Sequence, residues 1–206
     1  MVAVIVIVVI VVLLVLFGIA GFNKLRKADI GAQEALGGID VQLTRRADLI
    51  PNLVETVKGY AAHEKGVFEE VTAARTAVAA AAKGDDVAAK AAADADLQRA
   101  LVKVNAVAEN YPDLKASTNF LDLQKQLSDT ENQISFARQY YNDATATLNK
   151  AVATIPWMFF SGIAGVKARA FYDAPAANEA VPQVSFGNDA PAGEAAGESP
   201  AAPPVP

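Results

Sequence analysis

The sequence predicts an all-α protein: an N-terminal single transmembrane helix, followed by an elongated antiparallel three- to four-helix bundle and a disordered C-terminal tail. Three observations lead to this class. Residues 2–22 are all apolar or glycine, the residues that follow carry helical periodicity, and the C-terminal end is rich in Pro, Ala and Gly. We therefore divide the chain into an anchor at 1–22, a bundle at 23–172 and a tail at 173–206.

The apolar run from Val2 to Phe22 is long enough to cross a bilayer. Its roughly 21 residues would span ~31 Å as a helix, close to the ~30 Å hydrocarbon core. A cleaved signal peptide is the alternative, favoured by the small residues at 18–21. However, no basic residue precedes the run, and the run exceeds a signal core in length. The flank that follows it is basic, so we expect a single-pass protein of the cytoplasmic membrane, with the N-terminus outside and the bundle in the cytoplasm. The flanking residues are Lys24, Arg26 and Lys27.

Composition narrows the function classes. The chain has no cysteine, which excludes disulfides, thiolate metal sites and thiol nucleophiles. Its net charge is −5, and five of its 23 acids lie after Tyr172 with no base among them. The other 18 acids equal the 18 bases, so the body is neutral. A neutral body argues against nucleic-acid binding.

Turn residues divide the body into helices. The pattern from Asp29 to about Ala82 predicts one long helix, and residues 83–86 predict a turn. A second helix is expected over Val87–Glu109. A third is expected from near Thr118 to Ile155, where Pro156 follows.

The third helix carries a coiled-coil-like seam, with apolar residues at alternating spacings of three and four. After it, residues 156–173 predict a short fourth helix that packs Trp157, Phe159, Phe160 and Ile163 on the bundle. The seam residues are Phe120, Leu123, Leu127, Thr130, Ile134, Ala137, Tyr141, Ala144, Leu148, Ala151 and Ile155.

The stretch Gln42–Tyr60 predicts an amphipathic helix with two organised faces. A polar stripe on one face is either a docking surface for another chain or a solvated surface with the pairs Arg45–Asp48 and Glu55–Lys58. Pro51 predicts a kink or a restart of the helix, with Asp48 as a possible N-cap. The stripe consists of Arg45, Asp48, Asn52, Glu55, Gly59 and His63.

Arg46 falls in the middle of the apolar arc of this helix. An unpaired charge there would cost several kcal/mol, so Arg46 is expected either to meet a carboxylate from another helix or to extend its charged end to solvent. Glu131 and Arg138 lie beside the seam of the third helix. We therefore predict an internal ionic network in which Arg46 pairs with Glu131.

Three stretches together resemble the LemA family of bacterial membrane proteins. They are "DVQLTRRADLIPNLVETVKGYAAHE" at 40–64, "AR" at 74–75 and "ENQISFARQYYNDATATLN" at 131–149. The resemblance covers roughly residues 21–172. It implies an N-terminal membrane helix and an elongated antiparallel bundle, and it implies no established biochemical activity.

No constellation for catalysis or for a cofactor is present in the sequence. His63 is the only histidine, whereas a ferritin-like di-metal site needs two Glu-x-x-His pairs. Nucleotide-binding and nucleophile-elbow motifs are also missing. We therefore expect a non-enzymatic protein without cofactor that contacts the bilayer through residues 2–22, with oligomerisation possible. It is expected to act as a scaffold or adaptor and to bind an unidentified protein partner through the polar stripe or the acidic tail. The alternative is a lipid-interacting or membrane-shaping protein that uses residues 156–172.

Overall fold

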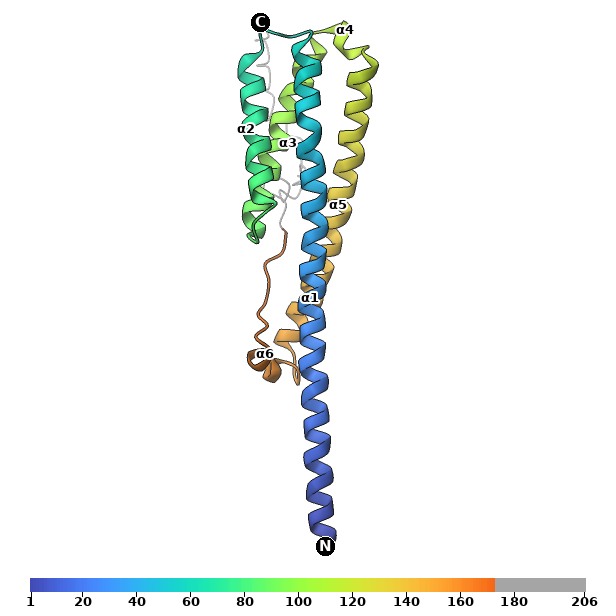
Figure 1. Cartoon of the computed structure of the whole chain (residues 1–206), viewed down its shortest axis with the longest axis vertical. Helices are drawn as coiled ribbons and strands as arrows, with labels where there is room; N and C mark the ends of the chain where they lie inside the picture. Colours follow the sequence, from blue (N-terminus) through green and yellow to red (C-terminus); the bar gives the residue numbers. More distant parts are fainter. Residues whose placement is uncertain (173–206) are drawn as a thin grey trace, which may run out of the picture.

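A computed structural model describes residues 1–172 of the chain (Figure 1). It confirms the all-α prediction, and no strand occurs in this range. The predicted disordered tail at 173–206 lies outside the described residues. The helices are α1 (Val2–Lys58), α2 (Lys65–Ala81), α3 (Val87–Glu109), α4 (Pro112–Lys115), α5 (Thr118–Ala153) and α6 (Met158–Ala164).

The predicted anchor and the first bundle helix form one helix, α1. It has 57 residues, which corresponds to a length of ~86 Å. Its apolar N-terminal part, residues 2–22 and named here the apolar span, is long and apolar enough to cross a membrane. None of its most apolar 18-residue window is buried by the rest of the protein. Figure 1 shows this part extending beyond the bundle, while the remainder of α1 runs through the bundle.

The prediction of one helix from Asp29 to about Ala82 is wrong. The helix ends at Lys58, a turn occupies residues 59–64, and α2 runs back along α1 from Lys65. Gly59 caps α1, and its N–H donates to the Glu55 carbonyl at 3.3 Å, while the Val57 carbonyl accepts from the N–H groups of Tyr60 and Ala61. The turn allows the apolar faces of α1 and α2 to pack on each other, which a single straight helix could not do. Phe68 and Val71 of α2 are buried in this way.

Pro51 does not restart the helix, because α1 continues through it. Proline has no N–H, so the Ala47 carbonyl lacks its usual donor four residues ahead. Arg75 of α2 supplies the missing donor: its Nε lies 3.0 Å from the Ala47 oxygen. Asp48 is therefore not needed as an N-cap. Two stretches that resemble the LemA family, at 40–64 and 74–75, meet at this bond.

The bundle is antiparallel and changes in thickness along its length (Figure 1). α1 packs mainly on α5, and the α2–α3 hairpin covers only the part of this pair farther from the apolar span. The main core lies among these four helices. A second, smaller core near the span contains Leu25, Ala32, Leu148, Ala151, Ala164 and Val166.

The predicted second and third helices are present as α3 and α5. α3 has the predicted bounds, and its N-cap Asp86 accepts hydrogen bonds from the N–H groups of Ala88 and Ala89. The seam of α5 faces the core as predicted, with one exception. Ile155 lies beyond the end of α5 and is exposed.

The prediction of a fourth helix over 156–173 is only partly correct. α6 spans seven residues, and Gly165 ends it in the left-handed conformation, with φ 64°. The chain then runs without helix or strand from 166 to 172. Of the four side chains expected to pack, Trp157 and Phe160 are half-buried, whereas Phe159 and Ile163 are exposed.

The bond between Arg75 and Ala47 generates a test. Arg75→Ala should destabilise the protein by ~1–3 kcal/mol, because it leaves a buried carbonyl without a donor. In a Pro51→Ala background the new N–H can bond to Ala47, so the same Arg75→Ala change should cost less. Chemical unfolding of the four variants in detergent gives the coupling energy. Equal costs of Arg75→Ala in both backgrounds would contradict this account of Pro51.

Candidate functional site

A cluster of four charged side chains lies at the centre of the bundle: Arg46 of α1, Asp94 of α3, and Glu131 and Arg138 of α5, named here the charge cluster. Arg46 Nη1 donates to Asp94 Oδ1 at 2.9 Å, and Arg138 Nη2 donates to Asp94 Oδ2. Asp94 is completely buried and Arg46 is 4% exposed. One carboxylate thus joins guanidinium groups from two other helices.

The pairing of Arg46 with Glu131 predicted from the sequence is present as an ion pair. Arg46 Nη1 lies 2.7 Å from Glu131 Oε2, without the alignment of a hydrogen bond. Two positive and two negative side chains therefore balance. Removal of one partner of a buried ion pair typically costs ~3–5 kcal/mol, and loss of Arg46 would leave this cluster with one uncompensated negative charge.

Tyr172 covers the cluster from the end of the described chain. Its ring lies 5.2 Å from Arg138 Cζ, and the residue is 3% exposed. Burial raises the pKa of Tyr172, as does the negative charge of Asp94, and both outweigh the opposing effect of Arg138. Burial alone would lower the pKa of Arg138, but the nearby Asp94 carboxylate raises it overall.

A second buried pair lies beside the cluster, between Lys90 of α3 and Asp40 of α1. The Lys90 side chain is completely buried, and its Nζ donates to Asp40 Oδ1 and, at 3.3 Å, to the Ala82 carbonyl. Burial raises the pKa of the Asp40 carboxyl, although Lys90 acts in the opposite direction. Because Ala82 is the C-cap of α2, Lys90 connects three helices at once. A cation there also suits the negative end of α2.

The segment 166–172, named here the strap, is fixed to α5 by two asparagine side chains. Asn149 donates to the Arg169 carbonyl and accepts from the Arg169 N–H, both at 2.9 Å. Asn142 makes the same pair of bonds with Tyr172, at 3.2 and 2.8 Å. The two asparagines are seven residues apart and so lie on one face of α5. They replace the backbone partners that a strand would have, which satisfies the strap's polar groups.

Two further contacts complete the attachment of the strap. Tyr141 is fully buried, and its hydroxyl donates to the Ala170 carbonyl at 2.8 Å. Arg169 Nε and Nη2 lie 2.9 and 2.8 Å from Asp29 Oδ1 on α1. The strap therefore joins α1 to α5 where the α2–α3 hairpin does not reach.

These charges neutralise one another and touch several helices each. The charge cluster joins α1, α3 and α5, and the Lys90 pair adds α2. Such an arrangement can set the register of helices that small alanine side chains alone would leave loosely specified. It lies at the junction between the four-helix part of the bundle and the part that consists of α1, α5 and the strap.

The predicted polar stripe is exposed, but it is only partly a single surface. Arg45, Asp48, Asn52 and Glu55 lie on α1, whereas His63 lies in the turn before α2 and is not part of the same helical face. Neither of the surface pairs Arg45–Asp48 and Glu55–Lys58 forms among the residues described. These side chains are exposed to water, where the attraction between two charges is too weak to offset the entropy lost in holding both side chains in one conformation.

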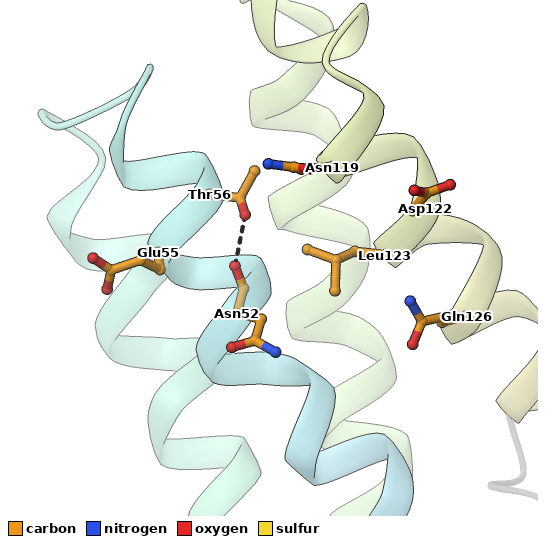
Figure 2. A pocket seen from close by; sticks show the side chains of 7 residues that line it. All are labelled: Asn52, Glu55, Thr56, Asn119, Asp122, Leu123 and Gln126. Atoms are coloured by element: carbon orange, nitrogen blue, oxygen red, sulfur yellow. Dashed lines mark hydrogen bonds between the residues drawn. The ribbon is translucent and has the colours of Figure 1, made fainter.

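A groove of about 420 Å³ lies between α1 and α5 at the end of the bundle remote from the span (Figure 2). Asn52 and Glu55 are the stripe residues that line it, and Thr56 donates its hydroxyl hydrogen to the Asn52 carbonyl at 2.8 Å. Its lining is mostly amide and carboxylate, which suits peptide groups and cations. α5 contributes Asn119, Asp122, Leu123 and Gln126.

The basic residues that follow the apolar span are exposed, and two of them make contacts within the protein. Lys24 Nζ lies 4.3 Å from the centre of the Trp157 ring, and Arg26 pairs with Asp29 at 3.6 Å. Lys27 is exposed. The flank thus contacts both the segment that leads into α6 and the residue that holds the strap.

Sequence reasoning missed Asp94 and Lys90. Both lie in an alanine-rich helix, where the small residues gave no clear apolar face. A signal was available, because Val87, Lys90, Asp94 and Leu97 follow one another at spacings of three and four. This pattern places Lys90 and Asp94 among core positions, as it places Arg46 in α1.

The fold and the cluster define a class: helical-bundle proteins with one candidate membrane helix near the N-terminus. The model of the LemA family matches residues 35–186, and the chain belongs to that family. This confirms the resemblance noted in the sequence.

The chain is also similar to named relatives. It is 27% identical to Magnetosome protein MamQ of Magnetospirillum gryphiswaldense over 179 residues, which cover 74% of this chain and 66% of the relative. It is 27% identical over 161 residues to Magnetosome proteins MamQ 1 and MamQ 2 of Paramagnetospirillum magneticum, covering 66% of this chain and 59% of each relative. The chain thus spans less than two thirds of the length of these relatives.

The charge cluster predicts a contrast between adjacent arginines. Arg46→Ala should lower the free energy of unfolding by ~3–5 kcal/mol, because it leaves Asp94 and Glu131 without their shared cation. Arg45→Ala, on the exposed face, should change it by well under ~1 kcal/mol. Thermal unfolding of the full chain in detergent, followed by circular dichroism, measures both. Equal small effects at the two positions would show that Arg46 is not part of a buried cluster.

Proposed function

We propose that this protein is a membrane-anchored helical scaffold, without enzymatic activity, that holds a binding surface for a protein partner at a fixed distance from the cytoplasmic face of the membrane. The observation that carries the proposal is the continuity of α1 from the apolar span into the bundle. With no flexible linker between anchor and body, the bundle cannot swing freely. The residues of α1 beyond Phe22 extend ~54 Å from the end of the span.

The surface for the partner is the groove at the far end of the bundle. It combines Glu55 and Asp122 with amide side chains, and its floor contains Leu123. Such a lining favours a peptide segment that carries Lys or Arg and offers backbone donors. The charge cluster stabilises the relative position of α1 and α5, the two helices that form the groove.

The charge of the flank supports the proposed orientation. Lys24, Arg26 and Lys27 lie immediately after the span, and basic flanks are retained on the cytoplasmic side. The MamQ relatives are named magnetosome proteins. We propose that the LemA-family body gives this chain and these relatives a common structural role, while any function in a magnetosome remains specific to the relatives.

The alternative function, membrane shaping by residues 156–172, draws on the exposed side chains of α6. Within that segment, the strap is hydrogen-bonded to α5 and α1, so only the short α6 is left to contact lipid. A single helix of seven residues is a small wedge compared with the rigid bundle beside it. Scaffolding therefore accounts for more of the molecule.

Two measurements in intact cells test the proposal. An impermeant thiol reagent should label Val2→Cys in intact cells and Ser135→Cys, exposed on α5, only after lysis. A photo-crosslinking amino acid at Gln126, in the groove, should give a discrete protein adduct, whereas the same residue at Gln98, exposed on α3, should not. External labelling of Ser135→Cys would overturn the orientation. Identical adduct patterns at 126 and 98 would overturn the groove as the partner site.

A further inference from the structure

After α5 the chain returns to the apolar span. Trp157 stacks on Phe17, and Phe160 meets the same ring edge-on, with centroid distances of 5.7 Å in both cases. The Phe160 ring also lies directly over Gly21, where an added Cβ would come within 2.7 Å of it. Any larger residue at 21 would displace the ring. α6 is thus held at a defined height on α1.

This height lies within the span. Phe17 is five residues before Phe22, the last residue of the apolar run, and five residues of helix correspond to ~7.5 Å. Helices that lie in a membrane interface bury their apolar face to a depth of ~5–10 Å. If α1 crosses the bilayer along this run, α6 lies at the depth of such an interfacial helix.

The side chains that α6 and its approach leave exposed suit this depth. Ile155, Phe159 and Ile163 are 72%, 68% and 77% exposed, although each is large and apolar. α6 contains no charged residue. In water these side chains would form an apolar patch beside an already apolar helix, whereas lipid would cover both.

The edge of this patch nearer the bundle is cationic. Lys24 lies over the Trp157 ring at 4.3 Å, and Lys167, just after α6, is exposed. Tryptophan and lysine are the side chains that commonly occupy the headgroup region, with apolar parts directed inward and charges directed to water. Trp157 also stacks on Phe17 of the apolar run, so this aromatic–cation pair lies level with α6, where the span meets its basic flank.

We infer that residues 155–163 insert into the interface of the bilayer that α1 crosses, with Ile155, Phe159 and Ile163 among the acyl chains of the leaflet nearest the bundle. The protein then has two membrane contacts, a spanning helix and a shallow one. Because α6 is fixed to α1 through Phe160 and Gly21 and to the bundle through the strap, the two contacts together set the tilt and rotation of α1. This inference rests on the proposed anchoring by α1.

The test uses the full chain, reconstituted in vesicles of phosphatidylcholine and phosphatidylglycerol. Because the sequence has no cysteine, each variant carries a single thiol for an environment-sensitive NBD label. Phe159→Cys probes α6, and Ile10→Cys probes the span. Phe136→Cys is the matched control, since Phe136 is 69% exposed on α5, away from the span.

The label at 159 should emit at shorter wavelength than the label at 136 and should be quenched by brominated lipids, as should the label at 10. Emission at 159 equal to that at 136, with the label at 10 quenched, would overturn the inference and leave the anchor intact. Absence of lipid quenching at 10 would remove the anchor and the inference together. A label at 159 that is protected from aqueous iodide but not quenched by brominated lipid would mean that protein covers the patch, which also overturns the inference.

Discussion

The structure depends on the neutralisation of charge inside a helical bundle. Asp94 is completely buried between two guanidinium groups, and each group comes from a different helix. None of the three charges can be moved without exposing another to an apolar interior, which makes sliding of α1, α3 or α5 costly. Much of the surrounding core is alanine, valine and leucine, which would tolerate several alternative packings. The charges select one.

This constraint reaches the membrane end through the strap. Tyr172 lies against Arg138 of the cluster, and Arg169 pairs with Asp29, close to the span. The strap leads back to α6, which packs on Phe17 and Gly21 within the apolar run. The cluster, the strap and α6 thus form a continuous path of contacts from the centre of the bundle to the span. This path gives the bundle a defined position relative to α1.

Periodicity in the sequence was sufficient to predict the helices that carry a strong apolar seam. It predicted the bounds of α3, the core face of α5 and the approach of Arg46 to Glu131. It failed where small residues or side-chain bonds determine structure. The turn at 59–64 interrupts a pattern that still looks helical, and Asp94 lies among alanines that give no clear apolar face. The strap depends on Asn142 and Asn149, whose partners are backbone groups in a segment without a periodic pattern.

The central claim is that the charge cluster fixes helix register more than it adds stability. Replacement of all four members by neutral residues (Arg46→Met, Asp94→Leu, Glu131→Gln, Arg138→Met) removes the charges without leaving any of them unpaired, so the fold should persist. Spin labels at Arg45 on α1 and Gln98 on α3 report the distance between these helices by electron–electron double resonance. We predict one narrow distance distribution in the parent chain and a broadened or multiple distribution in the quadruple variant. An equally narrow distribution in both, at the same distance, would contradict the claim.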